Sequence, residues 1–466
     1  MNDYSTKEGN ILNNQLENKK ILVVGMGKSG IAATQALLKL GSVVSVYDRK
    51  EEDNIDPQLI QFLRTKNVTC YFGEEPDNTG ELDMVVISPG VPLDTGFVQK
   101  AQEAGAEVIG ELEIAYRVGS GKYVAITGTN GKTTTTTLVG EIFKNSGRKT
   151  HVVGNVGVAV ISKALHTSEE DWLVTETSSF QLETTKYFRP EVSALLNITP
   201  DHMDRHKNIE NYAQAKAMIF KNQDENQHFV VNYDDEESMK LVKQCPAKVV
   251  PFSRKAELDF GCFVLDGDIV IRNEKGLIVE ICDKDELKIP GAHNLENALA
   301  AAAIGYFAGI SPEVIAKTLR EFEGVEHRLE FSGEVDGVRF VNDSKGTNPD
   351  ASIKAIEAMK GGVILIAGGY DKGSEYEEFV NAFDGKVKHL VLLGKTAPKI
   401  KETAERLGFT NITMCRDMDE CVKTGYKLAS PGDTVLLSPA CASWDMYTCF
   451  EQRGEHFKNC VRDLEK

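Results

Sequence analysis

The sequence lacks any apolar run that approaches the ~20 residues a membrane-spanning helix requires, so no membrane partner is expected. Residues 1–19 are rich in Asn, Lys and Glu and contain no apolar stretch, which argues against a secretory signal and predicts a frayed, flexible tail. The nine cysteines are scattered, odd in number and free of any C-x-x-C pair, so neither a disulfide framework nor a zinc framework is expected. These absences predict a protein of the reducing cytoplasm.

Positive charge is also scarce, because 53 Lys and Arg residues face 70 Asp and Glu residues and the formal net charge is −17. This balance disfavours nucleic acid as a partner, although an anionic substrate can still bind at a local basic site. The 466 residues, of which 41% are hydrophobic, predict an ordinary globular chain of two to four domains.

The rest of the chain is organised around residues 124–133, where an apolar run ends at Ile126 and a glycine-spaced turn leads to a helix expected over 132–142. Glycines let backbone N–H groups approach phosphate oxygens, and a helix N-terminus adds partial positive charge. Lys132 would contact the β- and γ-phosphates and the Thr133 hydroxyl would ligate Mg²⁺. The match to a P-loop is incomplete because Ile126 replaces its first glycine, so a plain strand–turn–helix with a surface lysine stays the alternative.

A second glycine-rich turn, residues 25–30, follows the buried strand expected at 21–24 and precedes a helix over 31–40. The next strand, 43–47, carries Asp48 at its tip, which completes a dinucleotide-binding fingerprint. Taken alone, this pattern indicates an NAD-dependent dehydrogenase. The turn specifies only a pyrophosphate, however, which a UDP-sugar also carries, and a dehydrogenase has no use for a triphosphate loop.

Further candidate residues follow the expected central strands. The strand at 172–176 ends in Glu176, whose carboxylate is well placed for Mg²⁺, although a helix N-cap region would read the same way. The strand at 192–198 runs into a loop, 199–206, that holds two His and two Asp residues and is a candidate for metal ligands or acid–base groups. Lys216 lies in an expected amphipathic helix, where a snorkelling lysine is the default interpretation.

Strands expected at 338–342, 363–367, 389–394 and 434–438 are each followed by a loop, which predicts a last doubly wound α/β unit with its loops on one edge. Cys441 lies in one of these loops. Because no base partner is evident in the sequence, we interpret it as a packed thiol and not as a nucleophile.

The form GTNGKT at 128–133 resembles the phosphate loop of the ATP-dependent Mur ligases of peptidoglycan precursor synthesis and of their relative, folylpolyglutamate synthase. Other matches to the Mur ligases are SPG at 88–90, DHMDRH at 201–206, GxHNxxNAxAA at 291–301, and DSKGTNP at 343–349, where the family has alanine at Gly346. The most discriminating are SPACAS-x-D at 438–445 and F-x-x-R-G at 450–454, which resemble the D-glutamate-adding branch. The DNPR- or DNPA-type motif of the diaminopimelate- or lysine-adding branches is not found.

The resemblance implies an α/β fold of three domains, each on a mainly parallel doubly wound sheet: Rossmann-like, P-loop-like, then Rossmann-like. After the tail at 1–19, it assigns 20–110 to the UDP-substrate, 111–323 to ATP and 324–466 to the amino acid. The implied reaction joins D-glutamate to UDP-N-acetylmuramoyl-L-alanine through an acyl phosphate, with a monomer as the expected state. A dehydrogenase and a nucleotide-binding regulator without turnover are the rival classes.

The resemblance also assigns the site residues. For ATP they are Gly128, Thr129, Asn130, Gly131, Lys132, Thr133, Thr134, Asn294, Asn297, Arg328 and Asp343. For the UDP-substrate they are Gly27, Lys28, Ser29, Asp48, Arg49, Ser88, Gly90, Asn155 and His202. For D-glutamate they are Lys345, Thr347, Lys372, Ser443, Trp444 and Phe450, with Trp444 where a smaller apolar residue is more usual.

Two Mg²⁺ ions, replaceable by Mn²⁺, are assigned to Thr133, Glu176, His202 and Lys216. In the family the lysine that matches Lys216 reacts with CO₂ to form a carbamate, and burial would favour the neutral amine that this reaction needs. Lys132, His202 and Lys216 are therefore the expected catalytic residues.

Overall fold

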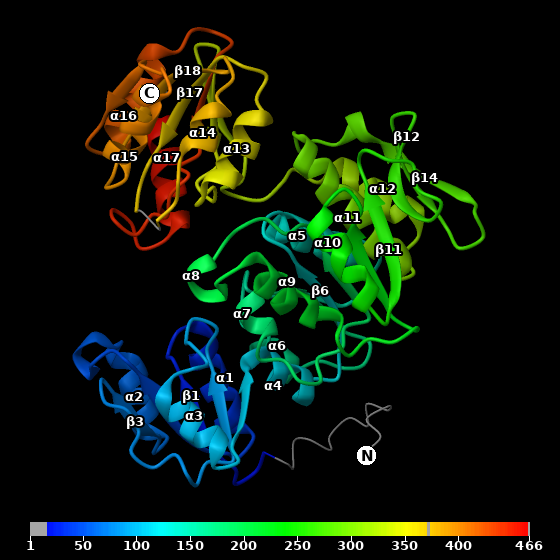
Figure 1. The fold of residues 1–466 in the computed structure, drawn as a ribbon, viewed down its shortest axis with the longest axis vertical. Coiled ribbons are helices and arrows are strands. Elements are labelled where there is room, and N and C mark those ends of the chain that lie inside the picture. Colours follow the sequence, from blue (N-terminus) through cyan, green and yellow to red (C-terminus); the bar gives the residue numbers. More distant parts are fainter. Residues whose placement is uncertain (1–15, 371–372, 465–466) are drawn as a thin grey trace. The chain divides into compact units, whose positions relative to one another are not determined.

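A computed structural model describes residues 16–370 and 373–464 of the chain (Figure 1). The chain divides into two compact units. The first unit consists of the chain up to Lys284 together with Glu296–Arg320. The second unit consists of Asp285–Leu295 together with the chain from Glu321 onward. Two sheets lie in the first unit and one in the second. The predicted α/β architecture of three mainly parallel sheets is confirmed.

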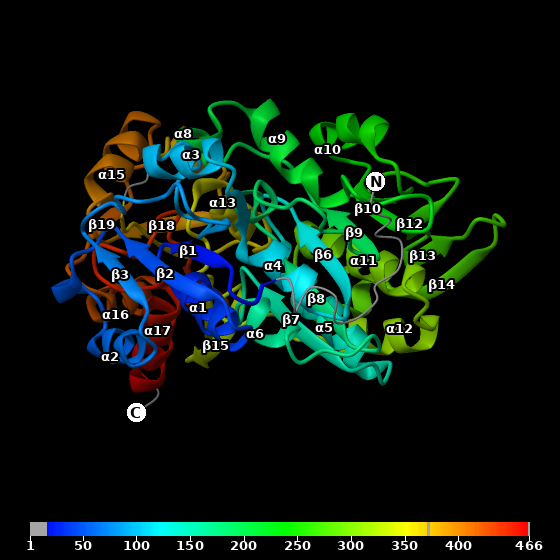
Figure 2. The ribbon, with the colours of Figure 1, turned by 90° about the horizontal axis from the view of Figure 1, so that it is seen from below.

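The first sheet has five parallel strands in the order β3-β2-β1-β4-β5, and Figure 2 shows β1, β2 and β3 side by side. The strands are β1 (Lys20–Val24), β2 (Val43–Asp48), β3 (Thr69–Phe72), β4 (Met84–Ile87) and β5 (Glu107–Gly110). The helices are α1 (Lys28–Lys39), α2 (Pro57–Thr65), α3 (Gly96–Glu103) and α4 (Glu111–Val118). The chain leaves β1 toward β2 and later returns to β4 on its other side, so the loop after β1 lies at a topological switch point.

The apolar run of β1 is continuous because both faces of this sheet are covered. Ile21 and Val23 pack in the same cluster as Leu37 of α1, whereas Leu22 and Val24 pack in the cluster that contains Phe97 of α3. Successive side chains of a strand point to opposite faces, so a parallel strand between two helical layers needs apolar residues at every position.

The second sheet has nine strands in the order β14-β13-β12-β11-β10-β9-β6-β8-β7. The strands are β6 (Lys122–Thr127), β7 (Thr150–Gly154), β8 (Trp172–Glu176), β9 (Val192–Leu195), β10 (His228–Asn232), β11 (Lys248–Ser253), β12 (Gly261–Leu265), β13 (Asp268–Arg272) and β14 (Ile278–Asp283). The helices are α5 (Lys132–Asn145), α6 (Ile161–Ala164), α7 (Ser179–Leu182), α8 (Met203–His206), α9 (Ile209–Ala217), α10 (Glu236–Leu241), α11 (Ala292–Phe307) and α12 (Pro312–Glu321). All neighbours pair in parallel except β12, β13 and β14, which form an antiparallel extension.

The third sheet has six strands in the order β15-β16-β20-β17-β18-β19. The strands are β15 (Glu330–Val335), β16 (Val338–Asn342), β17 (Val363–Ala367), β18 (Val387–Leu392), β19 (Ile412–Met414) and β20 (Thr434–Leu437). The helices are α13 (Pro349–Glu357), α14 (Glu377–Asn381), α15 (Ala397–Arg406), α16 (Met418–Leu428) and α17 (Phe450–Leu464). Only the β15–β16 pair is antiparallel. Among the described residues, no helix is both long and apolar enough to cross a membrane.

Within the first unit, α4 links the first sheet to the second through Glu113, whose side chain is fully buried. Its carboxylate accepts hydrogen bonds from the backbone N–H groups of Lys186, Tyr187 and Phe188 at 2.9–3.1 Å. It also accepts one from Arg117 Nε at 2.7 Å. A buried carboxylate with this many donors is fully satisfied, so the contact orients α4 against the loop after α7.

Glu111, at the start of α4, predicts a measurable pH dependence of stability. Burial raises the pKa of this carboxyl group from 4.5 to about 7, and the backbone N–H of Ile161 donates to it at 2.5 Å. The folded chain therefore holds a proton that the unfolded chain has lost, so the free energy of unfolding falls as pH rises from about 4.5 to about 7. Glu111→Gln should remove this slope and raise the midpoint of thermal unfolding at pH 8. An unchanged pH profile in the variant would contradict the assignment.

Candidate nucleotide and substrate sites

The loop between β6 and α5 is the centre of the predicted ATP site. β6 lies between β8 and β9, and α5 begins at Lys132, as the sequence predicts. Gly131 has a left-handed φ of 83°, and an added Cβ would lie 2.3 Å from Asn297 Oδ1. Only glycine fits this position, which lies at the N-terminus of α5, where the helix favours an anion.

Two lysine side chains converge on a single carbonyl oxygen of this loop. Lys132 Nζ donates to Gly128 O at 2.8 Å and to Thr129 O at 2.7 Å, and Lys216 Nζ donates to Gly128 O at 2.8 Å. Lys216 is 1% exposed, and its pKa is well below the usual value, first because of burial and then because of nearby Lys132. Burial thus favours the uncharged form of its amine, and the snorkelling interpretation is wrong because the side chain does not reach solvent.

Glu176 ends β8 with one carboxylate oxygen occupied and one left over. Oε1 accepts a hydrogen bond from Asn155 Nδ2 at 2.8 Å, whereas Oε2 is buried and has no hydrogen-bond partner. A buried carboxylate oxygen without a donor is costly unless a cation satisfies it. Glu176, with the buried Thr133 at the start of the neighbouring α5, therefore fits a hard divalent cation such as Mg²⁺.

The loop with two histidines divides into two environments. His206 is 4% exposed, and its Nε2 lies 3.0 Å from Ser179 Oγ, so it fixes α8 against α7. The side chain of His202 is 44% exposed, and its Nε2 lies 3.5 Å from Asp201 Oδ2. The backbone of His202 is in the left-handed region, with φ 55°. Of the two histidines, His202 is thus the one whose side chain reaches solvent.

The predicted residues of α11 belong to different units and are described separately. In the first unit, Asn297 Oδ1 accepts a hydrogen bond from Thr135 Oγ1 at 3.1 Å and lies against Gly131 of the phosphate loop. In the second unit, Asn294 Nδ2 donates to Pro290 O at 2.7 Å. The remaining predicted ATP residues of the second unit are Arg328 and Asp343. They lie close enough for the positive charge of Arg328 to favour the ionised form of the Asp343 carboxyl group. Burial raises the pKa of Asp343 to about 6.

At the switch point of the first sheet, the glycine turn is held by residues expected to face the UDP-substrate. Asp48 Oδ2 accepts from Met26 N at 2.7 Å, and Ser88 Oγ donates to Gly25 O at 2.9 Å. An added Cβ at Gly30 would lie 1.8 Å from Gly25 O, so close packing of α1 on the turn requires glycine. The other predicted residues of this edge, Gly27, Lys28, Arg49 and Gly90, are exposed, and Ser29 is half-buried.

In the second unit, Arg453 joins the two loops that carry the predicted D-glutamate residues. It is 2% exposed, and it donates to Ser344 O at 2.7 Å, to Ser344 Oγ at 3.0 Å and to Cys441 O at 3.1 Å. Ser344 Oγ in turn donates to Phe450 O at 2.8 Å. The loop after β16, the loop after β20 and the start of α17 are thereby fixed to one another. The sequence marked Arg453 only as part of a motif, and its organising role was missed.

The predicted D-glutamate residues are partly brought together. Lys345 Nζ lies 5.3 Å from the centre of the Phe450 ring, which is a cation–π contact. Ser443 is buried, and its carbonyl accepts from Tyr447 N at 2.8 Å. Trp444 is 63% exposed, with its ring centre 5.7 Å from that of Tyr370. Thr347 is half-buried beside Lys345, and Lys372 lies outside the described residues.

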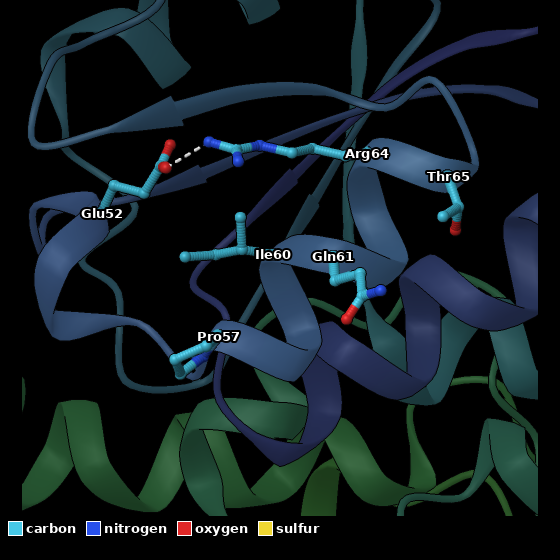
Figure 3. Close-up of a pocket in the computed structure, with 6 residues that line it drawn as sticks. All are labelled: Glu52, Pro57, Ile60, Gln61, Arg64 and Thr65. Atoms are coloured by element: carbon cyan, nitrogen blue, oxygen red, sulfur yellow. Dashed lines mark hydrogen bonds and ion pairs between the residues drawn. The ribbon is translucent and has the colours of Figure 1, made fainter.

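A separate hollow of about 500 Å³ lies beside α2, and Figure 3 shows Arg64 and Glu52 paired at its edge. It is lined by Glu52, Pro57, Ile60, Gln61, Arg64 and Thr65. None of these is a predicted site residue, so the hollow carries no part of the predicted chemistry.

Comparison with known proteins decides the family. Three family models match in succession: "Mur ligase MurD-like, N-terminal domain" at residues 19–110, "Mur ligase middle domain" at 126–305, and "Mur ligase, glutamate ligase domain" at 327–441. A UDP-N-acetylmuramoylalanine--D-glutamate ligase of Alkaliphilus oremlandii is 53% identical over 97% of this chain and 100% of its own. The chain belongs to the Mur ligase family.

Other relatives of this Mur ligase agree. The UDP-N-acetylmuramoylalanine--D-glutamate ligase of Clostridioides difficile is 48% identical over 97% of this chain and 100% of its own. Two solved structures share the fold: the UDP-N-acetylmuramate-alanine ligase MurC of Thermotoga maritima, with a TM-score of 0.60, 20% identity and coverage of 95% of this chain and 99% of its own; and MurF of the same organism in complex with ADP, with a TM-score of 0.59, 18% identity and coverage of 99% and 100%.

Proposed function

We propose that this Mur ligase uses ATP to join the amino group of D-glutamate to the carboxyl group of UDP-N-acetylmuramoyl-L-alanine. The observation that carries the proposal is the 53% identity, over 97% of the chain, to a relative named for this reaction. The glycine-containing loop before α5 lies beside Glu176, whose buried Oε2 has no hydrogen-bond partner and suits a cation. This arrangement supports ATP as the energy donor. The dehydrogenase alternative loses its support, because Asp48 holds the glycine turn through Met26 N.

The reaction proceeds in two steps. The carboxylate of the UDP-substrate attacks the γ-phosphorus of ATP, which gives an acyl phosphate and ADP. The amine of D-glutamate then attacks the acyl carbon, and phosphate leaves. Both steps concentrate negative charge, so this chain contributes mainly positioning and charge stabilisation.

In the first unit, the phosphate loop and its two lysines act on the triphosphate. Lys132 now donates to the loop carbonyls of Gly128 and Thr129, and a bound phosphate would offer it a stronger, anionic acceptor. Glu176 and Thr133 would hold Mg²⁺, which neutralises charge on the phosphates when bound. Asn297 keeps the Gly131 turn in place through close contact.

Lys216 is proposed to act as a carbamate that joins His202 and Glu176 at a second Mg²⁺. The burial of its amine supports this, because burial lowers the pKa and favours the uncharged form, and only an uncharged amine attacks CO₂. The new C–N bond forms as the amine loses a proton to solvent, and the resulting carbamate is an anion that suits a hard cation.

In the second unit, the residues that Arg453 holds together would bind D-glutamate. Lys345 supplies a positive charge, and Thr347 and Ser443 supply hydroxyl groups, which suit a dianionic amino acid. Phe450 limits the space beside Lys345. The exposed Trp444 is proposed to cover the amino acid from the solvent side.

At the edge of the first sheet, Lys28, Ser29 and Arg49 would contact the diphosphate and uracil, beside Ser88 and Gly90. The helix N-terminus of α1, which starts directly after Gly27, supports a pyrophosphate there. Action as a monomer in the cytoplasm, on these three small substrates, stays a prediction.

A phosphate-release assay with an amino-acid panel tests the proposal. We expect release only with UDP-N-acetylmuramoyl-L-alanine and D-glutamate together, and background rates with L-glutamate, D-aspartate, L-lysine or diaminopimelate. A lost carboxylate, a wrong stereocentre or a wrong spacing between the two carboxylates leaves a binding group unpaired, so discrimination should exceed about 100-fold. Equal rates with lysine or diaminopimelate would contradict the amino-acid assignment, and NAD(P)H turnover without ATP would contradict the whole proposal.

A further inference from the structure

The helices α16 and α17 lie side by side on one face of the third sheet (Figures 1 and 2). Asp419 lies in the first turn of α16, and His456 and Cys460 lie on α17. Residues four apart share one face of a helix, so the imidazole and the thiol both project toward the same side. The sequence does not reveal this grouping, because Asp419 is far from the other two and there is no C-x-x-C or H-x-x-x-H pair.

The polar atoms of these three residues converge. His456 Nε2 lies 3.0 Å from Asp419 Oδ2, and one oxygen of Asp419, one ring nitrogen of His456 and the sulfur of Cys460 all lie within 4.8 Å of one another. On its other side, His456 Nδ1 lies 2.9 Å from the Tyr447 hydroxyl. A partner on Nδ1 fixes the ring plane and leaves Nε2 directed at the carboxylate and the thiol, as outer groups do for metal-binding histidines.

We propose that Asp419, His456 and Cys460 form a binding site for one Zn²⁺ ion, or a cation of the same chemical class, in the second unit. Carboxylate, imidazole and thiolate are the three ligand types that Zn²⁺ takes in proteins, usually in a tetrahedron. On binding, the Cys460 thiol releases its proton to solvent, and the Nε2 lone pair of a neutral His456 completes the protein's three ligands. The Tyr447 oxygen then accepts the hydrogen bond of Nδ1–H.

The burial of the three side chains supports an open site with a water molecule as the fourth ligand. Cys460 is 8% exposed and closes the inner side, whereas the side chains of His456 and Asp419 are 38% and 53% exposed. The outer ligands can therefore adjust to the spacing that a tetrahedral metal requires, and solvent reaches the remaining position. A thiolate is a soft ligand that Mg²⁺ does not take, so this site is chemically distinct from the proposed Mg²⁺ positions.

Cobalt substitution in the full-length chain tests the site. After chelator treatment, Co²⁺ is titrated in the presence of excess Mg²⁺, and absorbance is recorded. We expect one equivalent to produce a thiolate-to-cobalt charge-transfer band together with the intense visible bands of a tetrahedral ion, both abolished by Zn²⁺. The Cys460→Ser and His456→Gln variants should lose the charge-transfer band, and Tyr447→Phe should weaken Co²⁺ binding about tenfold.

Matched controls separate this site from others. Cys70→Ser, in the first sheet, should keep the full spectrum. Asp419→Asn removes the exposed ligand and should weaken Co²⁺ binding without disturbing the buried face of either helix. Absence of a thiolate band in the unsubstituted chain would overturn the proposal. A band that survives Cys460→Ser but is lost on substitution of Cys415, the cysteine directly after β19, would also overturn it. Because the readout needs no turnover, it stands or fails separately from the ligase activity.

Discussion

Lys132→Ala is expected to lower kcat for phosphate release by about 10³-fold, which is the order of effect seen when one preorganised charge donor is removed from a reacting group. The ammonium group lies at the mouth of the phosphate loop, where it bonds to the carbonyls of Gly128 and Thr129. Alanine removes the positive charge of Lys132, and the carbonyls of Gly128 and Thr129 lose its ammonium group as a donor. Steady-state kinetics with D-glutamate and the UDP-substrate at saturation provide the measurement.

Lys144→Ala is the matched control for Lys132→Ala. It removes a lysine from the same helix, where the side chain is 48% exposed and paired with Glu141 at 2.8 Å. Exposed pairs of this kind contribute little, so activity and stability should stay close to those of the unsubstituted chain. A kcat for Lys132→Ala within tenfold of that of Lys144→Ala would show that the loop does not carry the transferred phosphoryl group.

The elements that the sequence predicted well are those with local signals. The buried strands at β1 and β17 are continuous apolar runs, and the start of α5 is set by the Gly131 turn, whose left-handed φ only glycine adopts easily. In each case a few neighbouring residues decide the conformation.

The elements that sequence analysis missed depend on contacts between distant segments. The antiparallel extension β12–β14 carries no motif, and its strands are defined by pairing with one another. Arg453 bonds to Ser344, which is 109 residues earlier in the chain, so its role cannot be read from F-x-x-R-G. The family has alanine at Gly346, yet an added Cβ would lie 2.5 Å from Asp343 Oδ2, so this loop is shaped around glycine.

The two histidines of the DHMDRH loop show the same limit within the site. The local pattern places them four residues apart and does not distinguish them, and only the resemblance to the family singled out His202. The fold buries His206 against Ser179 and leaves the side chain of His202 44% exposed, although the rings of both histidines contact that of Phe180 in α7. Burial, which a local motif does not encode, therefore distinguishes the two histidines.

Lys216→Ala is expected to reduce kcat by at least about 100-fold, the upper end of what loss of a metal-supporting group costs. The lysine is buried, which holds the pKa of its amine well below the usual value, and its Nζ lies 2.8 Å from the phosphate-loop carbonyl of Gly128. If its carbamate supplies an anionic ligand for the second Mg²⁺, a small carboxylate such as acetate or formate can enter the space left by alanine. Partial recovery of kcat with added acetate or formate is therefore expected in phosphate-release assays.

The specificity of this rescue decides between a carbamate and a plain structural lysine. Lys132→Ala should not recover with acetate or formate, because it lacks a cation and not an anion. Lys221→Ala, an exposed lysine just beyond α9, should keep full activity with or without them. If Lys216 only supported the loop through Gly128 O, its loss would lower activity with no response to carboxylates, and depletion of CO₂ would leave the unsubstituted enzyme unchanged. Full activity of Lys216→Ala would remove the carbamate, and with it the second metal ligand, from the proposed mechanism.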